Sequence, residues 1–433
     1  MKKNIFTSLY LFFSTVLCLF SQEKNVYLKA GSFYDSEQNS ILKNKVIQVK
    51  GNKIIGIGGA GLIPANAEVI DLTEYTVLPG LIDGHTHVLF DQSPQDDWAK
   101  HSIATLTLES EALRTLRGAK RARSYLDVGI TSIKDLGNSG LFLDVALRNA
   151  INEGTAIGPR VFAAGPIMAA QGGQIYGVTH GHQDLVDIEY RVVKSPGDAI
   201  NAVREHVNQG TDLVKICADN LPNRTRMTPE EIKAIVKTAH SYGLTVTAHS
   251  IGNESAWNAV QAGVDGIEHG FNLADSTLSL MAEKEVFLVP TENSRQYMDT
   301  YYALEGSSKE ELKWLDGYMD NMKNRLMRAR KKGVIIVAGS DNYTDIGVTR
   351  GTSSKDMLRT YFEAGMEPLE ILQAATYHAA ASLGKEKMIG VLKPGAMADI
   401  IAVKGDVKQD FVNTLNKIVF VMKDGEVYLR TTD

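Results

Sequence analysis

Cysteine and proline are scarce in this chain of 433 residues, which contains 2 Cys and 11 Pro. Cys18 lies in an apolar N-terminal segment, and if this segment is removed by cleavage, Cys217 is the one thiol that remains. One thiol cannot form an internal disulfide, so the fold must rely on its hydrophobic core even in an oxidising compartment. Glycine, in contrast, is plentiful, which fits many short turns between regular elements.

A strong charge of one sign is also missing. The formal net charge is -5, and charged residues make up 22% of the chain, an ordinary share for a soluble globular protein. Nothing in this balance points to nucleic acid or to an anionic membrane as a partner. Low-complexity segments and internal repeats are missing as well, so we expect ordinary globular domains.

The N-terminus has its own character. Two lysines precede an apolar stretch over residues 5–20, and this pattern predicts a secretory signal peptide over residues 1–21, with cleavage after Ser21. The stretch is short for a membrane span, so no stable membrane insertion is expected. Cys18 would suit a lipoprotein, but Leu17 stands where such signals carry a small residue. We therefore favour plain export, to a bacterial periplasm.

Both ends of the remaining chain are rich in β-type runs. Short alternating runs fill residues 26–77, and similar runs follow residue 398, with Asp424-Gly425 as a two-residue hairpin signal. Neither end has enough strands for a sheet with its own core. We therefore expect residues 22–77 and 391–433 to form one small composite domain, a β-sandwich.

The middle of the chain, residues 78–390, alternates apolar strand-like runs with helical segments. One such helix is expected from Pro229 to Tyr242, since Thr228 offers a capping hydroxyl. Eight strands that alternate with helices predict an α/β fold, a (β/α)8 TIM barrel. The eight runs lie near residues 78–87, 128–134, 160–165, 212–217, 244–249, 264–268, 286–290 and 334–340.

Two histidines close the first of these runs. His85 and His87 are spaced i, i+2, so on a strand both side chains point to the same side. Such a pair is suited to bind a metal ion together with further ligands. Four more polar residues, Lys215, His249, His269 and Asp341, lie at or near the ends of later runs. In a barrel all of these positions map to one rim, where catalytic groups sit.

Each of these residues also has an ordinary structural interpretation. A lone histidine in an apolar run is more often a hydrogen-bonded core residue, and Asp341 would serve as a helix cap. Lys215 is harder to explain in this way, because a bare ammonium between Val214 and Ile216 would be costly to bury. Either an ion pair or carbamylation by carbon dioxide would relieve that cost.

Several motifs give the chain a family resemblance. Residues 79–87 read Pro-Gly-Leu-Ile-Asp-Gly-His-Thr-His, and residues 393–400 read Lys-Pro-Gly-Ala-Met-Ala-Asp-Ile. With the strand-end residues, these motifs resemble the amidohydrolase superfamily over almost the whole mature chain. The runs at residues 262–270, 338–341 and 374–380 are most similar to its imidazolonepropionase-like and Xaa-Pro dipeptidase-like group, which includes metal-dependent carboxypeptidases.

The resemblance implies a role for each strand-end residue. His85, His87 and Asp341 would bind a first divalent metal ion, His249 and His269 a second, and a carbamate formed from carbon dioxide on Lys215 would bridge the two. Such ligands suit zinc, and also manganese or cobalt. The metals would activate a shared water, and Asp341 would move its proton to the leaving nitrogen. A mononuclear centre is the main alternative.

Substrate contacts are expected from the loops that follow the strands. Relatives often carry a Gly-Gly-His after the third strand, whereas this chain has Gln174 there, followed by Tyr176, His180 and His182. After the fourth strand, Arg224 or Arg226 would suit a peptide carboxylate, since guanidinium binds carboxylates bidentately. For all six, an ordinary surface role is the competing interpretation.

The leading hypothesis is therefore an exported metal-dependent hydrolase that cleaves an amide bond in dipeptides, Xaa-Pro or related, or in N-acyl amino acids. Its partner would be a small-molecule or short-peptide substrate, and a homo-oligomer is possible. A second hypothesis is a hydrolase of lactones, cyclic amides or phosphotriesters with the same binuclear site. A third is a non-catalytic binding protein on the same barrel.

Overall fold

The computed structural model describes residues 25–220 and 222–431. The expected signal peptide, residues 1–21, lies outside the described residues. Within the described ranges, no helix is both long enough and apolar enough to cross a bilayer.

The two ends of the chain share one seven-stranded mixed sheet. Its central strand β4 pairs in parallel with β1 from the N-terminal part and antiparallel with β14 from the C-terminal part. Leu28, Ile47 and Phe420, from both ends, lie fully buried in one apolar cluster. In the order of the sheet, the strands are β16 (Glu426–Arg430), β15 (Ile418–Lys423), β14 (Ile400–Val403), β4 (Glu68–Pro79), β1 (Asn25–Asp35), β2 (Ser40–Lys50) and β3 (Lys53–Gly58).

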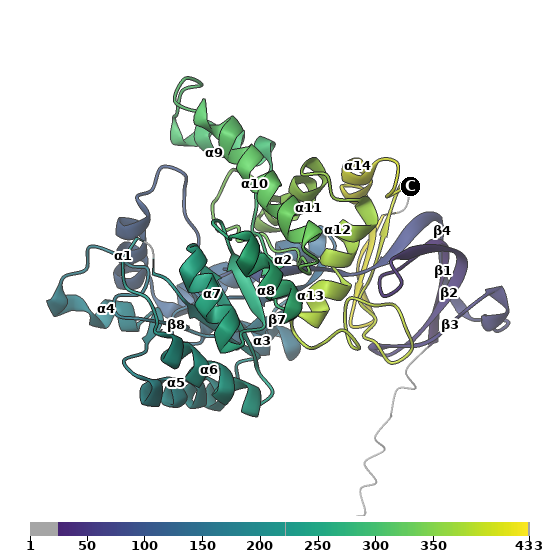
Figure 1. Ribbon diagram of the computed structural model, residues 1–433. Coiled ribbons are helices and arrows are strands. Elements are labelled where there is room, and N and C mark those ends of the chain that lie inside the picture. The colour runs from purple at the N-terminus through teal and green to yellow at the C-terminus, as the bar shows by residue number, and fades with distance from the viewer. Residues whose placement is uncertain (1–24, 221, 432–433) are drawn as a thin grey trace, which may run out of the picture.

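This sheet differs in detail from the expected sandwich. Hydrogen bonding runs without a break from β16 to β3, so the seven strands form one sheet and not two separate ones. The continuity arises because β1 is paired on both sides, with β2 and with β4. Figure 1 shows the strands from the N-terminal part (purple) and the C-terminal part (yellow) on the same side of the molecule.

The hairpin signal at Asp424-Gly425 is confirmed. The two residues join β15 to β16, and Lys423 is paired with Glu426 across the turn. Both turn residues have positive φ, 53° at Asp424 and 78° at Gly425. This conformation matches the twist of the flanking strands and favours Asp-Gly.

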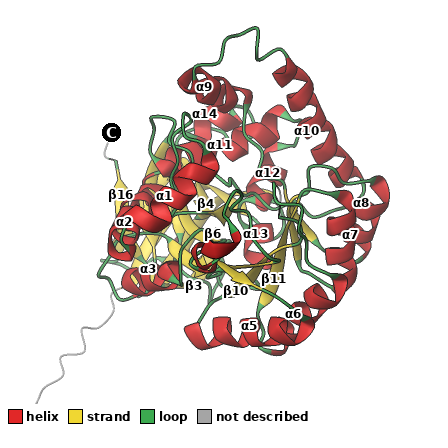
Figure 2. Ribbon diagram, turned by 90° about the vertical axis from the view of Figure 1, so that its left-hand side faces the viewer, coloured by secondary structure: helices red, strands yellow, loops and turns green. Residues whose placement is uncertain are grey.

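The middle of the chain is an α/β structure, as predicted, with parallel strands in two further sheets. One sheet has the order β5 (Leu81–Thr86), β6 (Ile130–Asp135) and β7 (Arg160–Ala163). The other has the order β13 (Phe287–Val289), β12 (Gly266–His269), β11 (Thr245–Ser250), β10 (Leu213–Cys217), β8 (Ile167–Ala169) and β9 (Tyr190–Val192). Figure 2 shows strands such as β10 and β11 in the interior, with helices α5 to α8 outside them.

The segment from 334 to 340 differs from its expected strand. It forms an isolated parallel bridge between Ile336 and Leu288 and is not assigned as a strand. Its backbone nevertheless bonds to both neighbours: Leu288 N donates to Ile335 O at 3.0 Å, and Gly84 N donates to Ala338 O at 2.8 Å. At the opposite junction of the two sheets, Asp212 N donates to Ala163 O at 2.8 Å.

The run expected at 160–165 is interrupted, and the short strands β8 and β9 were not predicted. β7 ends at Ala163 and β8 begins at Ile167, with Gly165 and Pro166 between them. Gly165 has a φ of 71°, and Pro166 has no N–H to donate to a neighbouring strand. These two residues explain the break.

Helices cover the outside of the strands. Successive helices pack on one another, α5 on α6, α6 on α7 and α7 on α8. The expected cap at Thr228 is confirmed, and Glu231 completes a capping box with it. The helices are α1 (Trp98–Leu108), α2 (Glu111–Asp127), α3 (Leu143–Asn152), α4 (Asp184–Asp187), α5 (Pro196–Gln209), α6 (Pro229–Ser241), α7 (Asn253–Ala262), α8 (Asp275–Glu283), α9 (Arg295–Glu305), α10 (Trp314–Lys331), α11 (Arg350–Glu363), α12 (Pro368–Ala374), α13 (Tyr377–Ala381) and α14 (Phe411–Leu415), with 3-10 turns at Ala60–Leu62 and His180–His182.

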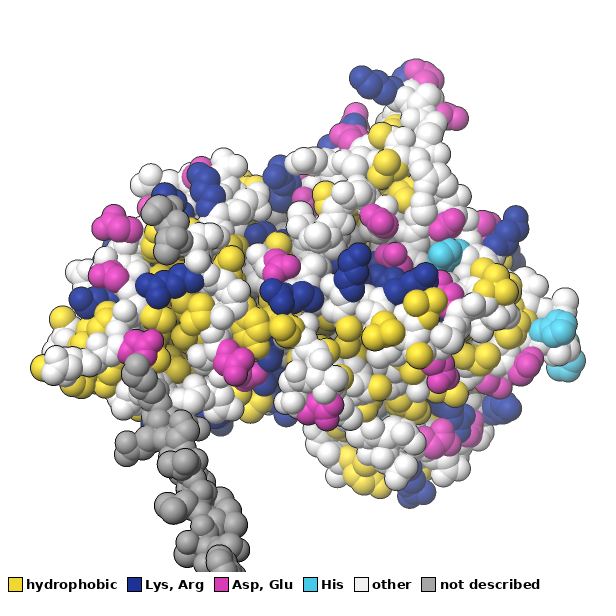
Figure 3. All heavy atoms as spheres, turned by 180° about the vertical axis from the view of Figure 1, so that it is seen from behind, with side chains coloured by type: hydrophobic (Ala, Val, Ile, Leu, Met, Phe, Trp, Pro, Cys, Tyr) yellow, Lys and Arg dark blue, Asp and Glu magenta, His cyan; other side chains and the backbone are white. Residues whose placement is uncertain are grey.

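Two features of the outer surface are plain in the figures. Helix α9 and the beginning of α10 project from the rest of the molecule (Figure 1), whereas the end of α10 packs against α8. On the face seen from behind, basic and acidic side chains are interspersed (Figure 3).

Replacing Gly425 with Ala tests the contact between the two ends of the chain. A Cβ at Gly425 would lie 2.0 Å from the carbonyl oxygen of Gly51, in the turn between β2 and β3. We expect Gly425→Ala to lower the free energy of unfolding by more than the ~1–3 kcal/mol that a positive φ alone costs. Gly384→Ala is the matched control, because Gly384 has a φ of 63° but nothing within 4 Å of the added Cβ. Equal losses in urea unfolding would contradict the clash.

Candidate active site

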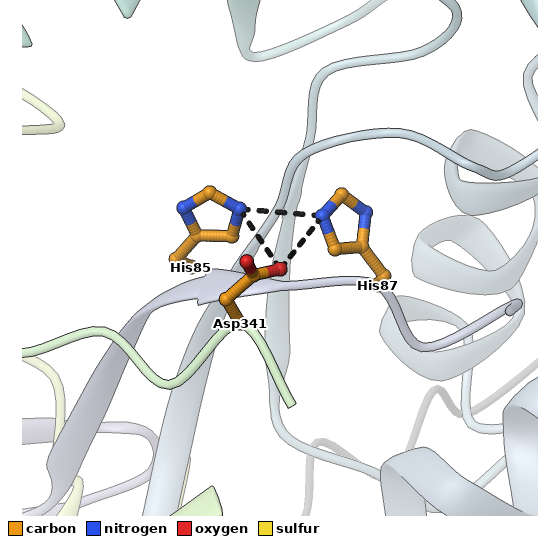
Figure 4. Close-up of side chains that lie close together, drawn as sticks. All are labelled: His85, His87 and Asp341. Carbon is orange, nitrogen blue, oxygen red and sulfur yellow. Dashed lines mark hydrogen bonds and ion pairs between the residues drawn. The ribbon is translucent and has the colours of Figure 1, made fainter. Parts of the chain in front are cut away.

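Three predicted metal ligands come together at the ends of their segments. One donor atom each from His85, His87 and Asp341 lies within 4.8 Å of the others. Asp341 Oδ1 is 3.4 Å from His85 Nε2 and 3.2 Å from His87 Nε2, and the two Nε2 atoms are 3.2 Å apart. Figure 4 shows the three side chains pointing toward one another. The arrangement matches the i, i+2 pairing expected from the strand.

Hydrogen bonds fix the orientation of both imidazoles. His85 Nδ1 lies 2.6 Å from Glu268 Oε2, and His87 Nδ1 lies 2.8 Å from the carbonyl oxygen of Gly137. An ionised carboxylate and a carbonyl oxygen only accept, so Nδ1 carries the proton in each ring. The Nε2 lone pairs are thereby directed to the space shared with Asp341, which is how proteins commonly present histidine ligands to metals.

Glu268 is the centre of a buried network. Its side chain is fully buried; Oε1 accepts from Lys134 Nζ at 3.0 Å and from Thr247 Oγ1 at 2.5 Å, while Oε2 accepts from His85. Burial alone would raise the pKa of Glu268, but the charges of Lys134 and Lys215 outweigh it, and the pKa is lowered. Glu268 is therefore a carboxylate at neutral pH.

The backbone is held in an unusual conformation at two of the predicted ligands. His269 has a φ of 65° and Asp341 a φ of 51°, the left-handed region that favours glycine. Tertiary contacts hold both: Arg325 donates to the carbonyl oxygen of His269, and Asp341 N donates to His85 O at 2.9 Å. Such outliers persist where the surrounding structure fixes them, and they concentrate at functional sites.

The other predicted ligands, Lys215, His249 and His269, line a cavity together with His87 and Asp341. This cavity has a volume of about 250 Å³. The rings of His249 and His269 have centroids 4.5 Å apart, and those of His85 and His269 are 5.0 Å apart. Lys215 is almost completely buried. The residues lining the cavity are His87, Phe90, Trp98, Asn138, Ile167, Gln174, Lys215, Pro222, His249, His269, Asp341 and Tyr343.

Burial sets the protonation of these groups. It lowers the pKa of His249 to about 4 and the pKa values of His85 and His269 well below their ordinary range, with the charge of Lys215 adding to the effect on His85 and His249. Burial also lowers the pKa of Lys215. The pKa of Asp341 would be raised by burial, but His85, His87 and Lys215 outweigh this and lower it. At neutral pH the site thus offers the neutral imidazoles of His85, His249 and His269 and the carboxylate of Asp341.

This donor set fits a divalent metal ion. Neutral imidazoles and a carboxylate are the protonation states that bind metals, and together they suit zinc, manganese or cobalt. A thiolate ligand is not offered here, because burial raises the pKa of Cys217 to about 12. The residues that would hold a metal are His85, His87 and Asp341, with Lys215, His249 and His269 beside them.

Of the six residues predicted to contact substrate, Gln174 is the one that lines this cavity. Its Nε2 lies 3.3 Å from His249 Nε2, and its Oε1 accepts from Tyr190 at 3.4 Å. Tyr176, His180 and His182 are exposed outside the cavity. Arg224 is exposed as well, and Arg226 pairs with Glu254 at the surface. The structure does not bring these five to the cavity, so a role for them in binding stays a prediction.

Sequence reasoning missed several residues of the site. Glu268 and Lys134 each place a charged side chain in a buried strand. The same signal drew attention to Lys215, but it was not applied to these two residues. Phe90, Trp98 and Tyr343 form an aromatic wall, with ring centroids of Phe90 6.5 Å from Trp98 and 5.5 Å from Tyr343. No pattern in the sequence joins these three, because they come from separate segments.

The chain is similar to known proteins over most of its length. The sequence model of the amidohydrolase family matches residues 76–428 of this chain. The chain belongs to this family. The predicted resemblance is confirmed, and so is the prediction of a metal-dependent hydrolase of carbon–nitrogen bonds.

Relatives include ochratoxinase of Aspergillus niger, which is 28% identical over 426 residues, covering 89% of this chain and 83% of the relative. Imidazolonepropionase of Geobacillus sp. (strain WCH70) is 22% identical over 428 residues, 90% of this chain and 91% of the relative. Among solved structures, a Xaa-Pro dipeptidase with bound methionine has a TM-score of 0.79 at 28% identity, with 94% of this chain and 100% of that one covered. A prolidase in complex with N-methylphosphonate-L-proline has a TM-score of 0.81 at 25% identity, with the same coverage.

Replacing Glu268 with Gln tests whether the Glu268 carboxylate orients the imidazole of His85. The variant removes the negative charge that orients His85 Nδ1, so we expect metal affinity to fall about 10–100-fold, as for comparable partners of histidine ligands. Competition with a chelator measures the metal affinity of the purified protein. Glu283→Gln is the matched control, since Glu283 lies exposed on α8. Unchanged affinity in Glu268→Gln would show that the network does not support the ligand.

The buried histidines predict a pH dependence of the metal-free protein. The unfolded chain protonates His249 near its ordinary pKa of 6.5, whereas the folded chain does so only near about 4. Stability from this group is therefore complete above pH 6.5 and is lost as the pH falls toward 4, by up to about 3 kcal/mol. Urea unfolding across this range should show a smaller loss in His249→Gln than in the wild type. Parallel curves would contradict the assignment.

Proposed function

We propose that this protein is an exported amidohydrolase that uses divalent metal to hydrolyse an amide bond in dipeptides, Xaa-Pro or related, or in N-acyl amino acids. One observation carries the proposal: donor atoms of His85, His87 and Asp341 converge within 4.8 Å. They do so at a cavity that Lys215, His249 and His269 also line. Export rests on the sequence of residues 1–21.

We also infer that the two parallel sheets together form a (β/α)8 barrel. The support is the backbone bonding at both junctions, from Asp212 to Ala163 on one side and from Gly84 to Ala338 on the other. The segment 334–340 would then take the place of the eighth strand. Such a barrel presents the ends of its parallel strands at one rim, as the candidate site requires.

The proposal includes two metal ions and a carbamate on Lys215. His85, His87 and Asp341 would hold one metal, and His249 and His269 the other. Burial supports the carbamate, because a lowered pKa gives Lys215 more of the neutral amine that reacts with carbon dioxide. When bound, the metals would lower the pKa of a water molecule and polarise the scissile carbonyl group.

The residues of the chain would divide the remaining work. Asp341, whose carboxylate faces the cavity, would accept a proton from the attacking water and deliver it to the leaving nitrogen. Glu268 would hold His85 in place through the 2.6 Å contact at Nδ1. The Gln174 amide, which also lines the cavity, would donate a hydrogen bond to the substrate.

Two observations support small amide substrates with an apolar group. Solved structures similar to this chain include proteins named Xaa-Pro dipeptidase and prolidase. Phe90, Trp98 and Tyr343 supply an apolar wall in a cavity of about 250 Å³. Among the described residues, no arginine lines this cavity, so a carboxylate anchor at Arg224 or Arg226 finds no support here.

Metal analysis of the mature protein, with a hydrolysis screen, tests the proposed function. The screen would use Xaa-Pro dipeptides and N-acyl amino acids, with zinc, manganese or cobalt added. We expect about two metals per chain and activity that is lost to chelator. A metal-loaded protein that turns over none of these amides would overturn the proposed substrates.

Substitution of Lys215 tests the bridging role. Lys215→Ala should lose most of the bound metal and the activity, because the variant cannot form the carbamate. Lys233→Ala is the control, since Lys233 is exposed on α6. Two metals per chain retained in folded Lys215→Ala would exclude the bridge and leave the remaining ligands to hold both ions.

A further inference from the structure

A second cavity lies apart from the candidate active site. It has a volume of about 410 Å³ and is lined by residues of α9, α11 and α14, by Val128 after α2, and by Ile346 and Val348. None of its lining residues belongs to the lining of the active-site cavity. The proposed reaction therefore gives it no role.

A buried lysine faces this second cavity. Lys355 on α11 is 9% exposed, and its Nζ donates to Leu415 O at 2.8 Å and to Val128 O at 3.5 Å. Among the described residues, no carboxylate lies within 4.0 Å of this ammonium. Burial, with no contribution from a neighbouring charge, lowers the pKa of Lys355 to about 8. An ammonium has three N–H donors, so one remains for a further acceptor.

The other charges of the lining compensate each other. Asp356 lies 3.6 Å from Arg359 Nε and accepts from Ser294 N at 3.0 Å. The positive charge of Lys355 is thus left without a counter-ion. The rest of the wall is mainly apolar, with Phe411, Val412, Leu415 and Leu358 among its residues.

We propose that this cavity binds a small monocarboxylate with an apolar tail, whose carboxylate pairs with the Lys355 ammonium and whose tail packs on the side chains of α14. An anion would supply the missing counter-charge, and a charge-assisted hydrogen bond is strongest where water is excluded. The tail would bury apolar surface against Phe411 and Val412. This site is independent of the proposed hydrolysis.

Calorimetric titration of the metal-loaded mature protein with decanoate tests the site. The wild type should bind decanoate, and Lys355→Met should weaken binding about tenfold or more, since the charged hydrogen bond is lost. Lys408→Met is the matched control, because Lys408 is exposed outside the cavity, and it should bind like the wild type. Decyltrimethylammonium, which has a tail of the same length but a positive head group, should not bind at this cavity.

A second variant keeps the test decisive. Val348 is 48% exposed at the rim, so Val348→Trp would fill the cavity from outside with Lys355 intact, and it should also weaken decanoate binding. If Lys355→Met fails to fold, as a thermal melt would show, Val348→Trp decides. No binding by the wild type, or equal binding by the wild type and the folded variants, would overturn the proposal. The latter result would place decanoate elsewhere, as at the active-site metals.

Discussion

The candidate site depends on one buried carboxylate, that of Glu268. It accepts hydrogen bonds from Lys134 and Thr247 and holds Nδ1 of His85, so two strands of each parallel sheet meet at it. A fully buried carboxylate without these partners would be costly, and with them it remains charged and fixed. The orientation of a metal ligand thus follows from the pairing of charges in the interior, and the same pairing holds Lys134 beside the site.

Strain and packing extend this constraint to the rest of the site. His269 and Asp341 have left-handed backbone conformations, which the contacts of Arg325 and of His85 O stabilise. Both residues are thereby directed toward the cavity at the ends of their segments. The seven-stranded sheet joins the two ends of the chain through β4, which leads directly into β5 and the histidine pair. The composite sheet is therefore continuous along the chain with the strand that carries the histidine pair.

Many strands and turns could be predicted from the sequence because short local patterns encode them. Apolar runs predicted β5, β6, β10, β11, β12 and β13, Thr228 predicted the start of α6, and Asp424-Gly425 predicted a hairpin. The failures have physical causes. Gly165 and Pro166 break a run that reads as continuous, and the 334–340 segment bonds to both neighbours without forming an assigned strand. Loop residues such as His180 and Arg226 were poor candidates because their side chains can face solvent as easily as substrate.

The amino-acid sequence is enough to identify which residues can bind a metal and the side of each strand on which they lie. That follows because side chains alternate along a strand and because imidazole and carboxylate groups are scarce in apolar runs. The folded chain alone shows which of these groups meet, how the imidazoles are oriented, and which aromatic side chains form the wall of the cavity. Those features depend on contacts between segments far apart in the chain, such as Glu268 with His85 and Phe90 with Tyr343, and no local pattern encodes such contacts.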